Sequence, residues 1–319
     1  MDSDVIFYVN IFLLAISILQ VLANLVVLTA YFRSSQCRRT DTIILLVSLA
    51  SIDFLYALLF IPYVVYLLVE SPPHDVNYNY NAVIILATGG PPAALMKSGC
   101  VITSFIAIDR IVAVYFPAKY YRLEKRKIMH CAFVIALMMA TIDGAVLFGT
   151  TKIASHPQCS TFACFTSPFF QTYWGMSNMA VNVLSSVLTF IVLVGLHRAL
   201  NSTMLNRSLE RKRKADNAAT RTAVCILVIS MIFGVVPGLI NGFAAYIELP
   251  LLKNVGFFVG TCASVSGLSH AFIFGMAHRD VRSSIMAMFL GKTLNSKSAS
   301  MGNSIAALDR SHYVVSVHS

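Results

Sequence analysis

Five charged side chains lie within long, otherwise apolar stretches of this sequence. They are Asp53, Lys97, Asp109, Arg110 and Asp143. A charge near the middle of a bilayer costs roughly 2.5–3.5 kcal/mol on translocon scales, so each of the five is a candidate functional residue. The chemistry open to them is pairing with an opposite charge, hydrogen bonding, or binding of a ligand.

Asp53 and Asn24 lie deep in two successive apolar stretches, 42–69 and 5–32. A carboxyl group at such a depth is either protonated or paired with polar groups or a cation. We interpret the two residues as parts of one polar site at the centre of a helical bundle. The alternative is that each side chain bonds only to the backbone of a neighbouring helix and contributes to packing.

Asp109 and Arg110 are adjacent at one end of the apolar stretch 91–117. An acid beside an arginine can hold the guanidinium in one rotamer, and its release would offer five donors to the carbonyl groups of a partner protein. The pair therefore suits a conformational switch. A charged pair that only marks the membrane boundary would give the same pattern.

Lys97 precedes Arg110 by 13 residues, which is about 20 Å of helix. Small-molecule pockets lie at this depth, and the ammonium group would suit an anionic ligand such as a carboxylate. A lysine can instead extend towards the membrane surface. Four residues near the outer ends of later stretches could supply ring walls and hydrogen bonds to the same ligand, or could serve packing alone. They are Tyr173, Asn178, Asn241 and Tyr246.

Seven apolar stretches must position these side chains. Of the 319 residues, 57% are hydrophobic and 12% are charged, against about 25% charged in a soluble domain. A helix needs about 20 residues to cross the hydrocarbon core. The predicted membrane helices span residues 5–32, 42–69, 91–117, 128–151, 169–197, 222–247 and 254–278. We place the third start at Pro91, because paired prolines suit a first turn; the alternative is a start near Asn81 with a kink.

The lysine and arginine residues gather in alternate connections between these stretches. Of 24 such residues, 21 lie in segments 33–39, 110–127, 198–221 and from Arg279 onward. The positive-inside rule places these segments in the cytosol. The sequence thus predicts an all-α membrane protein, a seven-transmembrane helix bundle with its N-terminus outside and its C-terminus cytosolic. Topology and contact with anionic lipid account for the net charge of +10, so we expect the lipid bilayer and no nucleic acid as a partner.

One bundle accounts for most of the chain, because no internal repeat or linker divides it. We predict a seven-transmembrane domain at residues 1–290, whose last part, Ser283–Leu290, is a short amphipathic helix lying along the membrane. Residues 291–319 are polar and rich in serine, and are predicted to form a disordered cytosolic tail.

The positions of the cysteines and histidines indicate which disulfides and metal sites the chain could form. Cys159 and Cys164 are the two cysteines predicted to face the oxidising exterior, where they form either a disulfide or two free thiols. The eight histidines are scattered, so we expect no metal and no cofactor. An intramembrane hydrolase needs several converging metal ligands, so we expect no enzyme. A channel or transporter for a small solute is the alternative function, although broken helices are suggested only at residues 89–92.

Several motifs in register resemble landmarks of rhodopsin-like G-protein-coupled receptors. The stretch Asp109–Tyr120 is similar to their third-helix signature, with Ile111 in place of the usual tyrosine. Asn24 with Val27 resembles the first-helix Asn-x-x-Val, and Leu49–Asp53 resembles the second-helix Leu-Ala-x-x-Asp. This resemblance implies that Asn24, Asp53, Asp109 and Arg110 belong to an activation switch.

The later helices extend the resemblance to these receptors. Pro237 stands where the sixth-helix proline belongs, and His270 and Phe274 occupy the Asn and Tyr positions of Asn-Pro-x-x-Tyr. By the same resemblance these three residues join the switch. As a hypothesis, the sixth helix pivots near Pro237 and opens a cytosolic cleft beside Arg110.

Where the sequence departs from this receptor pattern, it resembles a narrower family. The third stretch has no cysteine near its outer end, and Trp174 is the only tryptophan, so those of the fourth and sixth helices are missing. With Phe116–Tyr120 and His278–Arg282, this divergence resembles the nematode serpentine chemoreceptors, class BC. That resemblance implies a chemosensory receptor that binds an extracellular small molecule and activates a heterotrimeric G protein. Its expected location is the plasma membrane, including the ciliary membrane of a sensory neuron.

Overall fold

The computed structural model describes residues 3–39, 43–70, 79–120, 122–157, 159, 161–201, 210–240 and 255–289. Seven helices in these ranges are long and apolar enough to cross a membrane, which confirms the prediction of a seven-helix bundle. They are α1 (Ser3–Arg33), α3 (Ile44–Glu70), α4 (Ala82–Tyr115), α6 (Lys125–Thr150), α7 (Pro168–Asn201), α8 (Glu210–Ser230) continued by η3 (Met231–Val235), and α10 (Val255–Ala277). The short elements are α2 (Ser35–Arg39), α5 (Pro117–Tyr120), η2 (Phe162–Phe165) and α11 (Arg279–Phe289).

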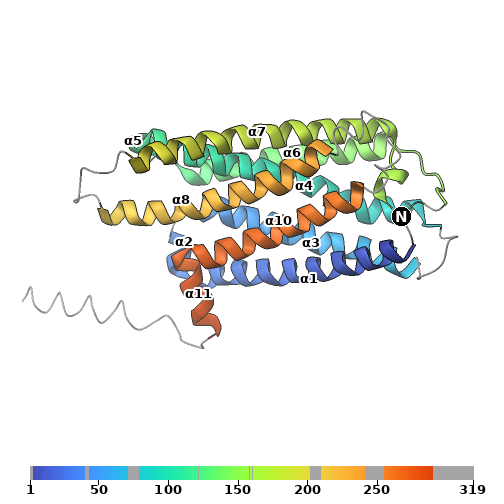
Figure 1. Cartoon of the computed structure of the whole chain (residues 1–319), viewed down its shortest axis with the longest axis horizontal. Helices are drawn as coiled ribbons and strands as arrows, with labels where there is room; N and C mark the ends of the chain where they lie inside the picture. The colour runs from blue at the N-terminus through green and yellow to red at the C-terminus, as the bar shows by residue number, and fades with distance from the viewer. Residues whose placement is uncertain are drawn as a thin grey trace, which may run out of the picture.

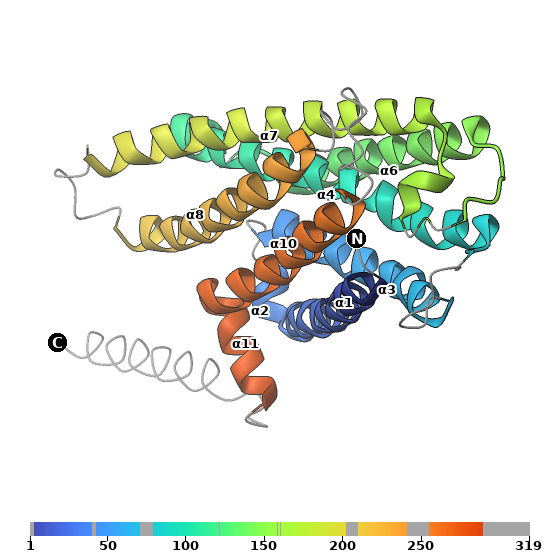
Figure 2. The same cartoon turned by 45° about the vertical axis from the view of Figure 1, so that its right-hand side comes forward.

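The long helices run side by side along the bundle (Figure 1). The N-terminus lies at one end, here named the N-terminal end, and α11 lies at the other, here named the α11 end. Figure 2 shows α11 turning sharply away from α10 at that end. The amphipathic helix predicted for 283–290 is thus part of a longer helix that begins at Arg279.

Helix α4 begins earlier than the favoured prediction of Pro91. Its first residue is Ala82, and the Asn81 side chain caps it by accepting a hydrogen bond from the backbone N–H of Val83. The helix continues through Pro91 and Pro92, so the alternative start near Asn81 is the correct one. The reason is that a helix satisfies its backbone groups internally, which a bilayer demands, and packed neighbours make the prolines tolerable there.

The hydrophobic core is divided into two clusters along the bundle axis. One cluster, at the α11 end, includes Val27, Ile102 and Phe274. The other, at the N-terminal end, includes Leu13, Phe60 and Phe165. Each of the seven long helices carries at least one buried or half-buried polar side chain away from its ends or, on α8, directly before η3. We call this set the polar layer; it comprises Gln20, Asn24, Asp53, Lys97, Asp143, Ser177, Asn178, Ser230 and His270.

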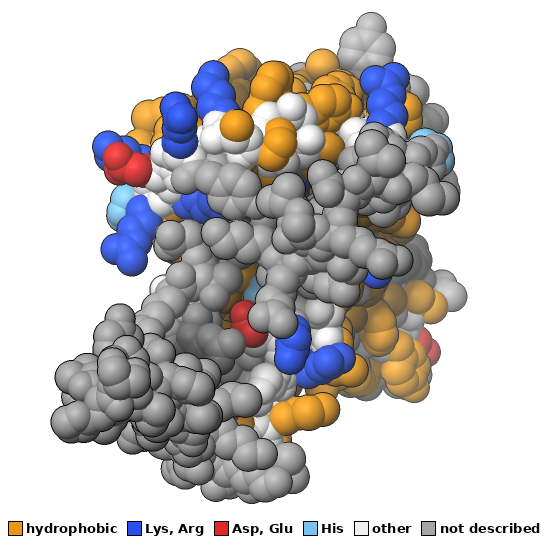
Figure 3. All heavy atoms as spheres, turned by 90° about the vertical axis from the view of Figure 1, so that its left-hand side faces the viewer, with side chains coloured by type: hydrophobic (Ala, Val, Ile, Leu, Met, Phe, Trp, Pro, Cys, Tyr) orange, Lys and Arg blue, Asp and Glu red, His pale blue; other side chains and the backbone are white. Residues whose placement is uncertain are grey.

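The outer surface is apolar along the helices and basic at the α11 end. Large hydrophobic side chains such as Leu19, Leu137 and Phe190 are more than half exposed. Such a belt would be unfavourable in water and suits a lipid environment. Figure 3 shows lysine and arginine side chains around the face of the α11 end. Described exposed examples are Lys119, Arg122 and Lys127.

Candidate functional site

A cavity of about 90 Å³ opens within the polar layer. Residues of α3, α4, α7, α8, η3 and α10 line it, together with the segment 236–240. Four residues that the sequence analysis singled out belong to its lining: Asp53, Asn178, Pro237 and His270. The structure therefore brings one predicted ligand residue together with three predicted switch residues.

A chain of three side chains crosses one part of this cavity. Nδ1 of His270 lies 2.9 Å from Oδ2 of Asp53, and Nε2 lies 2.8 Å from Oγ of Ser230. Ser266, one turn before His270 on the same helix, also reaches Nε2, at 3.2 Å. Because Asp53, His270 and Ser230 belong to α3, α10 and α8, this chain ties three helices together and can relay a proton between them.

Asn24 lies next to this chain without bonding to Asp53. Its Nδ2 donates to the carbonyl oxygens of Gln20, at 3.0 Å, and of Gly267, at 3.5 Å. Gln20 Nε2 in turn donates to the backbone oxygen of Asp53, at 3.0 Å. A side chain on Gly267 would overlap Gln20, so glycine is needed for this close approach of α10 to α1. Gln20, which the sequence analysis did not single out, is thus the link between Asn24 and Asp53.

Helix α8 changes its winding directly before Pro237. Residues Met231–Val235 form a π-helical turn, and the helix resumes at 236–240. Single π-turns inside helices are frequent at functional sites, and a proline removes a backbone donor from the helix. Asn182 of α7 packs against this turn, because a Cβ added to Gly234 or Gly238 would lie 2.8 Å from its side-chain amide. The described geometry thus places an irregular turn at the position predicted for a pivot.

Arg110 is buried at the α11 end and is fully engaged. It pairs with Asp109, its Nη2 donates to Oη of Tyr120 at 2.8 Å, and its Nη1 reaches Oγ1 of Thr220 at 3.5 Å. Arg110 and Asp109 are 3% and 5% exposed, so the pair is not a solvated boundary marker. The contact between Arg110 and Thr220 joins α4 to α8. The adjacent acid and arginine in the sequence did not predict this contact.

Helix α8 is therefore held at two points. Ser230 bonds to His270 in the cavity, and Thr220 contacts Arg110 near the α11 end. The two positions are ten residues apart, or about 15 Å along the helix. A change at the cavity that moved α8 would affect both the Ser230–His270 and the Thr220–Arg110 contacts, because a helix transmits displacement along its axis.

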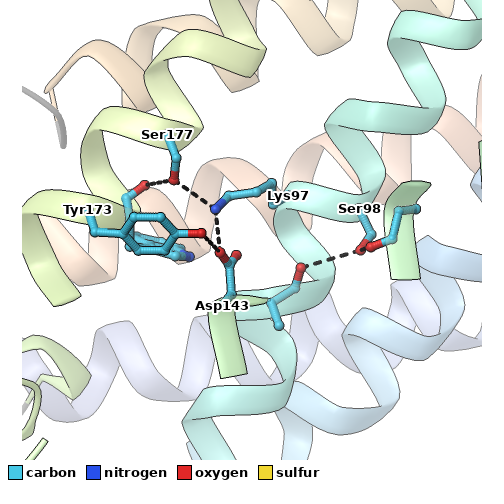
Figure 4. A network of polar contacts seen from close by, with 8 residues as sticks. Lys97, Ser98, Asp143, Tyr173 and Ser177 are labelled. Carbon is cyan, nitrogen blue, oxygen red and sulfur yellow. Dashed lines mark hydrogen bonds and ion pairs between the residues drawn. The ribbon is translucent and has the colours of Figure 1, made fainter. Parts of the chain in front are cut away.

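Lys97 and Asp143 form an ion pair at the level of the polar layer (Figure 4). Their Nζ and Oδ1 atoms are 2.5 Å apart, and the two side chains are 0% and 2% exposed. Ser177 accepts a second hydrogen bond from Nζ at 2.7 Å, and Oη of Tyr173 donates to the same carboxylate oxygen at 2.9 Å. The cluster joins α4, α6 and α7, and neither Lys97 nor Tyr173 is among the residues that line the cavity.

Comparison with known families decides how this bundle is classified. The family model described as serpentine type 7TM GPCR chemoreceptor Srbc matches residues 3–273, which is most of the chain. The chain belongs to the Srbc chemoreceptor family. A search of the curated proteins found no match. The expected resemblance to nematode serpentine chemoreceptors is confirmed, and the Srbc chain is a multi-pass membrane protein.

The ion pair of the Srbc chain changes how Lys97 is understood. The ammonium group that the sequence analysis offered to an anionic ligand has an internal carboxylate partner. The sequence held a signal for this pairing, because Lys97 lies 13 residues from Arg110 and Asp143 lies 15 residues from Ile128, each counted from a predicted cytosolic end. Two opposite charges at similar depth in consecutive spans indicate a pair, a connection that the interpretation of Lys97 as a ligand residue left out.

The remaining predicted residues lie away from the cavity or outside the described ranges. Asn241 and Tyr246 fall outside the described residues, as does the predicted tail 291–319. Cys159 and Cys164 are joined by a disulfide, with their Cα atoms 6.3 Å apart. Cys164 belongs to η2. This element packs on the N-terminal end, where the backbone N–H of Phe162 donates to Oη of a buried tyrosine, Tyr63, at 3.0 Å.

Phe274 packs at the α11 end beside a buried histidine that the sequence analysis did not assign to the switch. The Phe274 ring lies 6.0 Å from the ring of His278, edge to face, and Phe274 is 1% exposed. Burial lowers the pKa of His278 below its ordinary value, the charge of Arg110 lowers it further, and the charge of Asp280 opposes both. The packed arrangement of the Srbc chain therefore favours the neutral imidazole at this position.

This requirement predicts that acidification weakens the fold at the α11 end. As the pH falls below 6.5, the ordinary value for histidine, the unfolded chain binds a proton that packed His278 does not yet accept. Stability is complete above that pH and decreases below it, by at most about 1.4 kcal/mol per unit of pH. Thermal unfolding of the purified protein between about pH 7.5 and about pH 5.5 measures the slope.

The matched variants for this pH test are His278→Gln and His130→Gln. The first should flatten the slope, and the second, at an exposed histidine of α6, should leave it as in the wild type. A slope that is unchanged in His278→Gln would show that another group causes it.

Proposed function

We propose that this Srbc chain is a chemosensory G-protein-coupled receptor whose central cavity binds an extracellular small molecule. Binding shifts α8, and the α11 end then activates a heterotrimeric G protein. The receptor acts at the plasma membrane, including the ciliary membrane of a sensory neuron. Membership of a chemoreceptor family and a cavity that includes switch residues support the proposal.

The double restraint on α8 is the observation that carries the mechanism. A ligand in the cavity meets His270 and Ser230 directly, because both line it. A ligand that favours the state in which the Ser230 contact is broken shifts the equilibrium by its difference in affinity for the two states. Movement of α8 about the turn before Pro237 then withdraws Thr220 from Arg110. The released guanidinium offers donors to carbonyl groups of the partner.

The charge distribution supports this direction of signalling. The exposed lysine and arginine side chains of the α11 end suit a cytosolic face, so the N-terminal end and its disulfide face outward. In this orientation the ligand enters from the end opposite to Arg110. The proposed G-protein surface comprises the α11 end around Arg110, with the exposed Lys119 and Arg122.

The proposal is tested by expression in cells that report G-protein activation. Small-molecule panels are applied, and the basal signal of Ser230→Ala is compared with that of the wild type. Loss of the Ser230–His270 hydrogen bond removes about 1 kcal/mol of restraint, so the basal signal should rise about fivefold where few receptors are active. Ser48→Ala is the control, because the Ser48 hydroxyl donates only within α3, to Ile44 O at 2.8 Å.

Two results would contradict the receptor mechanism. The first is an unchanged basal signal in Ser230→Ala at equal surface expression. The second is ion conductance by the purified protein in bilayers without any G protein, which would favour the channel interpretation.

A further inference from the structure

Two hydrogen-bond donors lining the cavity lack an acceptor among the described residues. Nε1 of Trp174 and Nδ2 of Asn178 are both buried and unpaired. The two residues are four positions apart on α7, so they lie one above the other on the same face of the helix. Asn178 is 4% exposed. A buried donor without an acceptor costs free energy, which indicates that an acceptor occupies this place in the bound state.

The charges around the cavity favour an acceptor that carries no charge. Asp53 and His270, the ionisable acid and base of the lining, are paired with each other. The ammonium of Lys97 is paired with Asp143 outside the lining. A carboxylate in the cavity would therefore be buried near Asp53 with no unpaired cation of the described lining to balance it, which is unfavourable. A ketone, ester or lactone carbonyl accepts the same hydrogen bonds without that cost.

Size and lining restrict the rest of the ligand. An apolar cavity of about 150 Å³ can hold benzene, so a cavity of about 90 Å³ admits only a small ligand. Apolar side chains of four elements, Ile52, Met96, Phe233 and Val259, line it beside the polar groups. They would cover a short alkyl chain.

We infer that the ligand is a small, uncharged carbonyl compound. Its carbonyl oxygen accepts hydrogen bonds from Trp174 and Asn178, and its alkyl part lies against Met96, Phe233 and Val259. This inference rests on the proposed function, because it names the class of molecule that the receptor senses.

The experiment measures binding separately from signalling. The purified full-length receptor in lipid nanodiscs is heated with small ketones, esters and lactones, and with carboxylates and alkanes of matched length. A bound ligand raises the melting temperature by mass action. We expect members of the carbonyl set to stabilise the receptor, and the matched carboxylates and alkanes to have no such effect.

Two substitutions test the donors themselves. Trp174→Phe removes the indole N–H and keeps an aromatic ring for the stack on Phe170, where the centroids are 6.3 Å apart. Asn178→Leu removes the amide at similar size. Each should weaken carbonyl binding about tenfold. Asn10→Leu is the control for Asn178→Leu, since Asn10 is also a buried asparagine but does not line the cavity.

Several outcomes would overturn the inference. One is that carboxylates or alkanes stabilise the receptor as much as carbonyl compounds do. Another is that no carbonyl compound stabilises it. The third is that Asn10→Leu and Asn178→Leu weaken carbonyl binding equally.

If a compound of another class activates the G protein, the proposed function stands and the ligand class fails. If carbonyl compounds bind as described and no G protein responds, the ligand class stands and the proposed function fails.

Discussion

Lys97→Met is expected to remove most of the folded receptor from the cell surface. The substitution leaves the Asp143 carboxylate buried with no opposite charge from its partner helix. Breaking a buried ion pair by removing one partner costs about 3–5 kcal/mol, a large part of the roughly 5–15 kcal/mol that stabilises a typical protein. Surface labelling of a tagged receptor, together with thermal unfolding of the purified protein, measures the effect.

The double variant Lys97→Met with Asp143→Leu separates charge imbalance from packing. Replacement of both charges by apolar groups of similar size is often neutral or stabilising, so surface expression should recover. Asp143→Leu alone should be as harmful as Lys97→Met, because it leaves the ammonium unpaired. If the double variant is as unstable as either single one, the pair does not act through its charges.

Arg110→Ala is expected to lower surface expression, because it leaves the Asp109 carboxylate buried without its partner, and to abolish ligand-dependent signalling by the receptors that reach the surface. In the structure the guanidinium bonds to Asp109, Tyr120 and Thr220, and in the proposed active state it bonds to the partner instead. Hydrogen bonds to a charged group contribute about 1.5–3 kcal/mol, so the loss of even one lowers coupling by about tenfold or more. A reporter of G-protein activation, with the response normalised to surface receptor, measures the loss.

Arg122→Ala is the matched control for Arg110→Ala. Arg122 is exposed at the same end of the bundle, so its removal changes the net charge equally without touching the buried cluster. Thr220→Val should act in the opposite direction to Arg110→Ala and raise the basal signal, because it releases α8 from the guanidinium. Unchanged signalling in Arg110→Ala would reject the switch role of this residue.

The polar layer unites these expectations. Asp53, Lys97 and Asp143 are costly in hydrocarbon when unpaired, and each is paired across two helices. The Lys97 cluster fixes α4, α6 and α7 together, whereas the His270 chain ends on α8, the helix with the π-turn. The first arrangement suits a rigid frame and the second a movable element, since one hydroxyl contact is weaker than a buried ion pair.

Sequence alone determined the helices of this receptor and their number. Apolar stretches of about 20 residues bounded by charges can only cross a bilayer as helices, so composition was enough. It also marked Asp53 and Arg110, because charged groups are conspicuous in apolar surroundings, whereas Pro237 and His270 were identified by their resemblance to receptor landmarks. The start of α4 was misplaced at Pro91, since a local preference of proline was weighed above the packing that tolerates it inside the helix.

Tertiary structure decided which of these residues meet. The pairing of Lys97 with Asp143, the contact of Arg110 with Thr220 and the unpaired donors of Trp174 and Asn178 depend on how helices are rotated and placed against one another. Hydropathy gives the depth of a residue in the membrane but carries little information on its direction around the bundle. Partners on different helices are chosen by that direction, so only the packed structure determines them.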